Sequence, residues 1–139
     1  MSVRYLLDTD VLSEPVKPRP NRKIMDRLRR HRSDSVTASP VWHELVYGCA
    51  GLPASFRRLT LERYLDEVLA PALVILPYDS AAAAWHAGER ARLEAAGRTP
   101  PFVDGQIAAV ARVRSLTLVT RNTADYEDFD GLVVEDWSA

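Results

Sequence analysis

Cysteine, histidine and long apolar runs are scarce in this sequence. Cys49 is the only cysteine and has no partner for an internal disulfide, and the three histidines, His31, His43 and His86, are scattered. This composition excludes a zinc site of clustered Cys and His, so any metal must be held by oxygen ligands. No apolar stretch approaches the ~20 residues that span a bilayer, and no charge-flanked apolar segment lies near the start. We therefore expect a cytoplasmic protein.

Excess charge is also lacking, because the net charge is −1 over 139 residues, of which 47% are hydrophobic. This length fits a single domain, residues 1–139, that can bury a core, and the sequence contains no repeat or linker. The basic residues are nevertheless unevenly placed. Eight of the 18 form a segment, here called the basic stripe, in which Asp26 is the only acid: Lys17, Arg19, Arg22, Lys23, Arg27, Arg29, Arg30 and Arg32. The stripe is either a nucleic-acid contact or an ordinary solvated surface.

Short apolar runs alternate with helical patterns along the chain. The patterns predict strands at 5–7, 35–38, 73–76, 116–120 and 132–134. They predict a helical turn at 11–13 and helices at about 21–31, 40–50, 54–69, 79–96 and 103–115. Such alternation indicates βαβ units, so we expect an α/β fold in which helices cover both faces of a short parallel sheet, giving three layers.

Several side chains in these elements have predicted places. We expect Ser39 to cap the helix that follows it, Trp85 to lie in the core and His86 to lie at the surface. The helix at 79–96 has a face of small residues that would let another helix approach closely: Ala84, Gly88, Ala91 and Ala95.

The first strand ends abruptly in Asp8, Thr9 and Asp10. Strands of a parallel sheet are buried on both faces, and ligands gather just beyond their carboxyl ends. Asp8 is therefore placed where a site can form. The alternative is that both acids only bond to local backbone, as Asp often does where a strand turns into a helix.

Two further acids lie at the starts of helices that follow strands. Glu44 shares a helix face with Val41 and Leu45, at the inner side or its border, where a carboxylate needs a partner. The alternative is an exposed edge residue paired with an arginine. Asp104 lies in the first turn of its helix, where a simple capping role is equally open.

Polar residues also follow the fourth strand, namely Thr120, Asn122 and Asp125. In the expected fold they can meet the acids of the first strand and of the helix starts at one rim of the sheet. Close carboxylates repel one another unless a hard divalent cation neutralises them, so the sequence predicts Mg²⁺ or Mn²⁺. Such a site can activate water for attack on phosphorus, and the basic stripe would hold the remaining phosphates of a polyanion.

Four segments, 6–14, 42–48, 103–109 and 120–126, resemble the four motifs of PIN-domain ribonucleases, in the family's order and across essentially the whole chain. The closest group is that of the VapC and FitB-like toxins of bacterial toxin-antitoxin pairs. The resemblance implies a metal-dependent endoribonuclease with an RNA substrate. It also implies a homodimer, held inactive in a heterotetramer or larger assembly by a cognate antitoxin whose tail enters the site.

The resemblance carries roles onto individual residues. Asp8, Glu44 and Asp104 match the first, second and third acids, with Asp8 and Asp104 as the main metal ligands and Glu44 completing the shell or positioning the water. Thr9 and Thr120 match the hydroxyl positions near the metal. The tentative RNA contacts are six residues of the basic stripe: Lys17, Arg19, Arg22, Lys23, Arg27 and Arg30.

The fourth motif departs from the family's pattern, because Asn122 stands where many members carry an acid. Asn keeps an oxygen ligand and loses a charge, so either Asn122 or Asp125 fills the fourth catalytic position. Asp10 is expected to be a structural cap of the turn that follows it.

Two alternative functions are weighed against this one. A phosphotransferase of the haloacid-dehalogenase type fits Asp8, Thr9 and Asp10, but it needs a lysine and the chain has only Lys17 and Lys23, both just after the first strand. A non-catalytic RNA-binding or interaction module on the same fold is the other alternative. The presence of all three principal acids argues against it.

Overall fold

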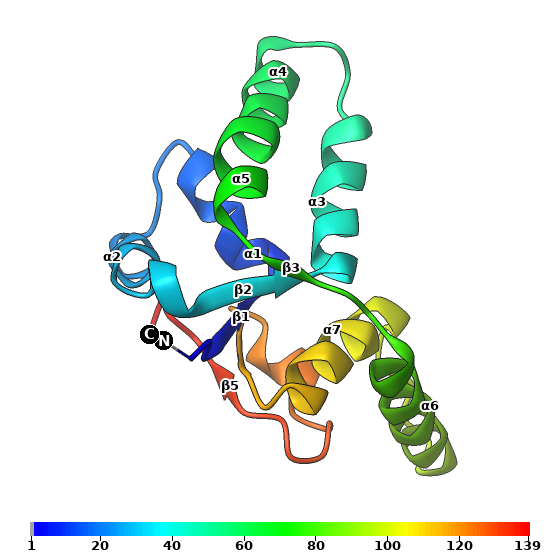
Figure 1. Ribbon diagram of the computed structural model, residues 1–139. Coiled ribbons are helices and arrows are strands. Elements are labelled where there is room, and N and C mark those ends of the chain that lie inside the picture. Colours follow the sequence, from blue (N-terminus) through cyan, green and yellow to red (C-terminus); the bar gives the residue numbers. More distant parts are fainter. Residues whose placement is uncertain (1) are drawn as a thin grey trace.

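The computed structural model, shown in Figure 1, describes residues 2–139. Five strands form one sheet in the order β3-β2-β1-β4-β5, and every neighbouring pair is parallel. The strands are β1 (Tyr5–Leu7), β2 (Ser35–Ala38), β3 (Ile75–Leu76), β4 (Thr117–Val119) and β5 (Val134–Glu135). The α/β class and the short parallel sheet are therefore confirmed, although the two edge strands are shorter than their apolar runs predict.

Helices fill the segments between the strands. They are α1 (Thr9–Leu12), α2 (Arg22–Arg30), α3 (Ser39–Ala50), α4 (Phe56–Arg63), α5 (Ala70–Ala72), α6 (Ser80–Ala95) and α7 (Phe102–Val113). Three single-turn 3-10 helices join them: η1 (Glu14–Val16), η2 (Arg32–Asp34) and η4 (Thr123–Tyr126). The predicted helix at 54–69 consists of α4 and a π-helical stretch, η3 (Tyr64–Leu69). None of these helices in residues 2–139 is both long and apolar enough to cross a membrane.

Three layers follow from the connections between parallel strands. Parallel crossovers are right-handed, so the path from β1 through β2 to β3 puts α1 to α5 on one face, and the return to β4 puts α6 and α7 on the other. Figure 1 shows α3 and α4 on one side of the strands and α6 and α7 on the other. Helix α6 packs along the outside of α7. The predicted three-layer arrangement is confirmed.

The core lies on both faces of β1 and β4. Leu6 and Leu118, which are register partners, are fully buried, and Ile107 of α7 packs with them. Trp85 packs against this core as predicted. Because both faces of the sheet are covered, the strands are apolar at successive positions rather than at alternate ones.

Two predictions about the helices are wrong. Helix α3 starts at Ser39 itself and its N-cap is Ala38, because the Ser39 hydroxyl instead accepts a hydrogen bond from the Tyr78 amide at 3.1 Å. The small residues of α6 do not face another helix, since all four are exposed: Ala84, Gly88, Ala91 and Ala95. The helix packs through its other face, which includes Ala82, Glu89 and Leu93.

His86 is also misplaced by the sequence, because it is buried in that inner face of α6. Its Nδ1 lies 3.0 Å from the hydroxyl of Tyr78, and its ring contacts the edge of Phe102 with centroids 4.9 Å apart. Burial and the charge of Arg90 lower the pKa of His86. The ring fits there because Gly105, on the facing helix, has no side chain.

The topology puts a switch point at the carboxyl ends of β1 and β4. From β1 the chain first builds the sheet toward β2 and β3, and it then returns to add β4 on the other side of β1. At such a switch point the following segments diverge to opposite faces and leave an opening. Asp8 follows β1 and Thr120 follows β4, so both lie at this switch point.

Candidate active site

Asp8 has both a local and a long-range role at the end of β1. Its side chain is almost buried, with 6% exposed, and its Oδ1 accepts a hydrogen bond from the Thr9 amide at 2.7 Å, which caps α1. Its Oδ2 accepts a second bond from the hydroxyl of Tyr126 at 3.2 Å. The predicted local bonding is therefore present, but it uses only one of the two oxygens.

Glu44 reaches the same place from α3. The side chain is half-buried, and its Oε1 accepts a hydrogen bond from the Thr9 hydroxyl at 2.9 Å. Its position at the border of the inner face is confirmed. The alternative of an exposed residue paired with an arginine is wrong, because Thr9 supplies the bond and connects α3 to the end of β1.

Asp104 lies in the first turn of α7 without capping it. The N-cap is Pro101, with no side-chain hydrogen bond to the helix amides. The Oδ1 of Asp104 instead accepts a hydrogen bond from the Tyr126 hydroxyl at 3.3 Å. The side chain therefore turns toward Asp8 and leaves the helix terminus uncapped, which rules out the simple capping role.

The electrostatics of Asp104 link the acids to one another. Burial, followed by the negative charges of Asp8 and Asp125, raises the pKa of Asp104 to about 6. Glu44 adds a smaller effect of the same sign, and the bond from Tyr126 opposes it. Carboxylates influence each other in this way only when they are close. The hydrogen bonds agree, because Tyr126 contacts both Asp8 and Asp104, and Thr9, next to Asp8, contacts Glu44, so these three acids lie near one another at one rim, as predicted.

Asp10 fixes the loop after β4. Its Oδ2 accepts bonds from the Arg121 amide at 3.0 Å, the Thr120 hydroxyl at 3.4 Å and the Asn122 side-chain amide at 3.3 Å. The prediction that Asp10 caps the turn that follows it is wrong, because Asp8 already does this. Burial and the charge of Asp8 raise the pKa of Asp10. Its Oδ1 is buried and has no hydrogen-bond partner among residues 2–139.

The two candidates for the fourth acid position behave differently. Asn122 is exposed, and its side-chain amide is used in the bond to Asp10. Asp125 is also exposed, but its charge acts on Asp104. The hydroxyl of Thr120, which is fully buried, accepts a hydrogen bond from the backbone amide of Asn122 at 3.1 Å, so Thr120 belongs to the same network of bonds in this loop. Of these two residues, Asp125 is the one whose charge acts on Asp104.

Tyr126 is the site residue that the sequence did not reveal. It is buried, and it contacts both Asp8 and Asp104 through one hydroxyl. Burial, then the charges of these two acids, raises the pKa of Tyr126 above its usual range. Its position directly after Asp125 was the available signal, but a tyrosine in a turn behind a strand is ordinarily a core residue.

The donor set at the rim suits a hard cation, because it consists of carboxylate and hydroxyl oxygens. Among residues 2–139, no three Asp, Glu, His or Cys side chains surround one point closely enough to enclose an ion. Mg²⁺ does not need such a cage, since it binds through one or two carboxylates and retains several waters. Asp8 and Asp104, bridged by one hydroxyl, with Glu44 beside them, fit a partial shell of this kind.

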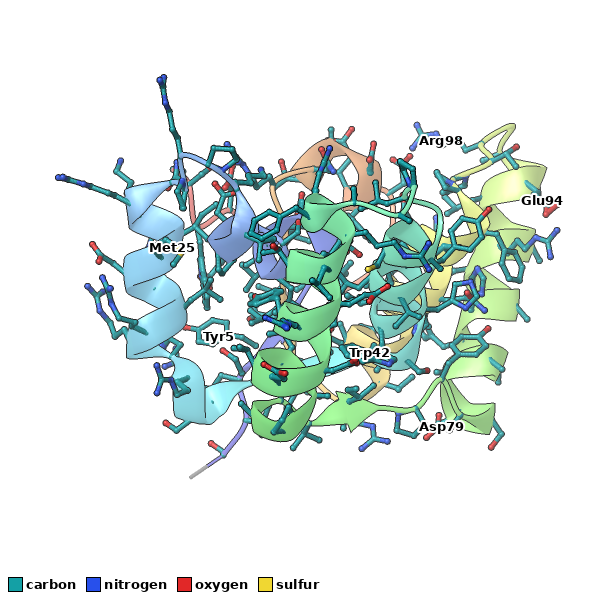
Figure 2. All side chains as sticks on the ribbon, turned by 90° about the horizontal axis from the view of Figure 1, so that it is seen from above. Tyr5, Met25, Trp42, Asp79, Glu94 and Arg98 are labelled. Atoms are coloured by element: carbon teal, nitrogen blue, oxygen red, sulfur yellow. The ribbon has the colours of Figure 1, made fainter. Side chains whose placement is uncertain are left out.

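Some side chains of the basic stripe bond to other parts of the protein, and others extend into solvent. Lys17 lies 2.7 Å from the buried carboxylate of Glu14, which also lies 3.5 Å from Arg121. Burial would raise the pKa of Glu14, but the bonds from Lys17 and from the Asn21 amide, with the charges of Lys17 and Arg121, lower it. Arg27 donates to the carbonyl of Asp136 at 3.3 Å. The other four tentative RNA contacts are exposed: Arg19, Arg22, Lys23 and Arg30. Figure 2, where Met25 marks α2, shows this helix at one side of the molecule with side chains extending outward.

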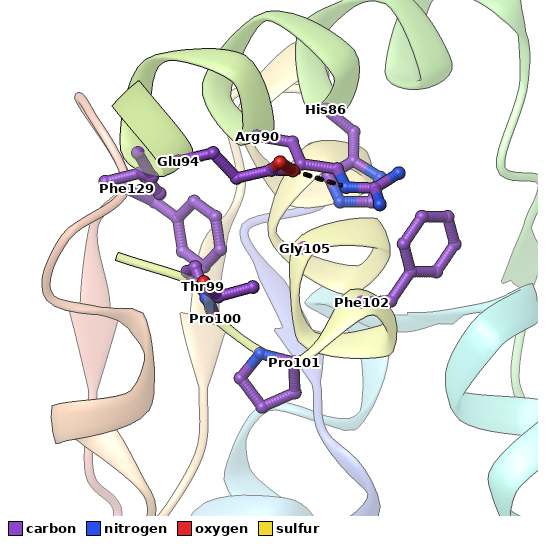
Figure 3. Close-up of a pocket in the computed structure, with 10 residues that line it drawn as sticks. His86, Arg90, Glu94, Thr99, Pro100, Pro101, Phe102, Gly105 and Phe129 are labelled. Carbon is purple, nitrogen blue, oxygen red and sulfur yellow. Dashed lines mark ion pairs between the residues drawn. The ribbon is translucent and has the colours of Figure 1, made fainter. Parts of the chain in front are cut away.

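A cavity of about 310 Å³ lies between α6 and the start of α7, as Figure 3 shows. Its walls include Phe102, Phe129 and Gly105, and Arg90 at its edge pairs with Glu94 at 3.1 Å. None of the candidate acids lines it. The cavity is therefore separate from the acidic rim, although both adjoin the first turns of α7.

The sequence profile of the PIN domain matches residues 5–132. This chain belongs to the PIN-domain family. Toxin FitB of Neisseria gonorrhoeae is 34% identical over 135 residues, which cover 95% of this chain and 97% of that protein. The tRNA(fMet)-specific endonuclease VapC of Shigella flexneri is 34% identical over 138 residues, which cover 98% of this chain and 99% of that one.

Solved structures share the fold of this PIN domain over nearly its full length. A chain in the crystal structure of FitAcB from N. gonorrhoeae superposes with a TM-score of 0.87 at 32% identity, covering 96% of this chain and 97% of that one. A chain in the crystal structure of DNA-bound VapBC from Salmonella typhimurium superposes with a TM-score of 0.83 at 30% identity, covering 97% of this chain and 98% of that one. The resemblance to the VapC and FitB group is confirmed, and the haloacid-dehalogenase alternative is wrong.

Proposed function

We propose that this PIN domain is a metal-dependent endoribonuclease that acts as the toxin of a toxin-antitoxin pair. One observation carries the proposal: Asp8, Glu44 and Asp104, from three separate segments, converge at the switch point of the sheet. Carboxylates that lie close together repel one another and destabilise the fold, and a bound divalent cation neutralises that repulsion. The names of the relatives, which include a toxin and an endonuclease, support this activity.

The proposed partners follow from the same relatives. The solved neighbours include FitAcB and VapBC, and a further neighbour, VapBC-5 of Mycobacterium tuberculosis, is a member of the VapBC family of toxin-antitoxin systems. We propose a cognate antitoxin protein as the partner of this chain, and a homodimer as its own assembly, within a heterotetramer or larger complex. Its place of action would be the cytoplasm, where its RNA substrate is found.

The proposed roles of the side chains follow from their contacts. Asp8 and Asp104 would hold Mg²⁺ or Mn²⁺, and Glu44, oriented by Thr9, would complete the shell or position a water. When bound, the cation would acidify a water for attack on phosphorus and stabilise the leaving oxygen. Asp125 would fill the fourth acid position.

The test is to incubate the purified protein with tRNA, rRNA and mRNA in Mg²⁺, in Mn²⁺ or in chelator, and to map the cut ends. We expect cleavage with either cation and none in chelator. The melting temperature should also rise with cation, because a ligand that binds only the folded state stabilises it. Cleavage that persists in chelator would contradict the metal dependence. No cleavage of any RNA, with no thermal shift, would support the non-catalytic alternative.

We also propose that the exposed part of the basic stripe holds RNA. Lys23 and Arg30 share a face of α2 and are exposed, whereas Arg27 is engaged with Asp136. Lys23→Glu with Arg30→Glu should weaken RNA binding, measured in chelator, and reduce the slope of log affinity against log salt by about 1.4, the value for two lost phosphate contacts on single-stranded RNA.

The matched control changes the same total charge elsewhere. Arg57 and Arg63 are exposed on α4, outside the stripe. Arg57→Glu with Arg63→Glu should leave the salt dependence nearly unchanged. An equal effect of the two double variants would mean that RNA responds only to net charge, and the stripe would then be an ordinary solvated surface.

A further inference from the structure

One tyrosine hydroxyl connects the two carboxylates on which the proposed metal site depends. Tyr126, with 2% of its surface exposed, comes from η4, whereas Asp8 follows β1 and Asp104 starts α7. Its hydroxyl oxygen lies 3.2 Å from Asp8 Oδ2 and 3.3 Å from Asp104 Oδ1. Two acids from distant segments therefore share one donor.

This contact joins one hydrogen-bond donor to two acceptors. Ionised carboxylates only accept hydrogen bonds, and a phenol has one hydrogen to donate, which here is shared between two acceptors at nearly equal distances. A positive hydrogen between two negative groups reduces their repulsion. Each carboxylate oxygen has two lone pairs, so an oxygen that accepts from Tyr126 can still bind a cation.

Contacts outside the site hold the ring of Tyr126 and the segment that carries it. The ring of Tyr126 is buried near Phe129, with centroids 6.3 Å apart. A few residues further on, the amide of Asp130 donates to the buried carboxylate of Glu89 on α6 at 2.7 Å, and Arg92 holds that carboxylate with two bonds. The segment that carries Tyr126 is thus attached to α6, which helps to hold the hydroxyl in place between the two acids.

We propose that Tyr126 is a positioning residue of the metal site, whose hydroxyl sets the orientation and separation of Asp8 and Asp104 for one divalent cation. The inference rests on the proposed function, because it concerns the same acids. Residues that hold metal ligands typically contribute 10-fold to 100-fold to metal affinity. The hydroxyl therefore acts through the two acids, with no need to touch the substrate.

The test compares two substitutions that each remove one tyrosine hydroxyl. Tyr126→Phe keeps the buried ring, and calorimetric titration with Mn²⁺ in the absence of RNA should give an affinity at least about tenfold weaker than that of the wild type. The control is Tyr64→Phe, since the Tyr64 hydroxyl donates to the carbonyl of Leu12 at 2.6 Å and contacts no acid. Tyr64→Phe should bind Mn²⁺ as the wild type does.

A second measurement uses the unmodified chain. Adding Mg²⁺ to the wild type should change the near-ultraviolet absorbance of tyrosine, because the two acceptors of the Tyr126 hydroxyl become metal ligands. Tyr126→Phe should lose this change and Tyr64→Phe should keep it. Its absence from the wild type, when Mg²⁺ binding is detected by calorimetry, would overturn the inference even if Tyr126→Phe failed to fold.

The possible outcomes separate this inference from the proposed function. Wild-type protein that binds Mn²⁺, with Tyr126→Phe folded and binding it equally or more tightly, overturns the positioning role and leaves the metal-dependent nuclease intact. Wild-type protein that binds neither Mn²⁺ nor Mg²⁺ overturns both. In cleavage assays, a lower kcat with an unchanged KM for RNA supports positioning, since the RNA contacts are untouched.

Discussion

Asp104→Asn is expected to lower the rate of RNA cleavage more than about 100-fold while leaving the protein folded. The substitution keeps the shape of the side chain and an oxygen that can accept from Tyr126, but it removes the charge that would bind the cation. The rate is measured on the RNA that the wild type cuts, at saturating Mg²⁺, with circular dichroism to monitor folding.

The same variant should be more stable than the wild type when metal is absent. The folded-state pKa of Asp104, raised to about 6, exceeds the ordinary value near 3.8. The folded chain therefore binds a proton more tightly than the unfolded chain, so ionising Asp104 costs stability that builds up between about pH 4 and pH 6 and persists at higher pH. This cost disappears below about pH 4, where the group is protonated in both states. Asn carries no such cost, so its advantage in melting temperature should be present at pH 7.5 and lost at pH 4.

A matched control separates this effect from the loss of any acid. Asp66→Asn removes an exposed carboxylate from η3 and should change neither cleavage nor the thermal shift with Mg²⁺. Cleavage retained by Asp104→Asn would instead remove Asp104 from the metal site. A variant that is inactive but less stable than the wild type would show that its charge is satisfied within the fold rather than held for a cation.

The sequence predicted that Asp8, Glu44 and Asp104 lie near one another because their positions depend on secondary structure. Apolar runs and helix-start signals are local, and the rule that carboxyl ends of parallel strands share one edge then brings Asp8, Glu44 and Asp104 together. No distance between side chains was needed for that inference. The structure places all three where the pattern predicts, and only their individual hydrogen bonds were left open.

The residues that the sequence misplaced depend on contacts between distant segments. Asp10 bonds to the loop after β4, more than a hundred residues away, and Tyr126 turns inward to two acids. The polar side chain of His86 suggested a position at the surface. It is buried instead, because Gly105 on the facing helix has no side chain and leaves room for the ring. Such pairings are decided by the direction of individual side chains, which periodicity does not encode.

Gly105→Ala is expected to destabilise the protein by about 1–3 kcal/mol, the usual cost of adding atoms to a packed interior. A Cβ at this position would lie 2.2 Å from Nε2 and 2.6 Å from Cδ2 of His86. If the ring moves into the adjoining cavity, which it also lines, it gives up its contacts with Tyr78 and Phe102. Either α7 or the ring must move. Movement of α7 would displace Asp104, so the variant should also cleave RNA more slowly.

Gly88→Ala is the control, since it makes the same change on the exposed face of α6, where nothing lies within 4 Å of the new atom. Alanine there should stabilise the protein by about 0.5–1 kcal/mol, because glycine is a poor helix former. The two variants thus have opposite expected signs in thermal or urea unfolding. Gly105→Ala with stability equal to or above the wild type would contradict the close fit between α6 and α7.

A double-mutant cycle identifies the partner in the clash. His86→Ala alone leaves a void and removes the partner of the Tyr78 hydroxyl, so it has a cost of its own. Combined with Gly105→Ala, it provides the space that the new methyl group needs, and the double variant should lose less stability than the sum of the two single variants. Additive losses would mean that His86 is not the group that opposes the new methyl group of Gly105→Ala.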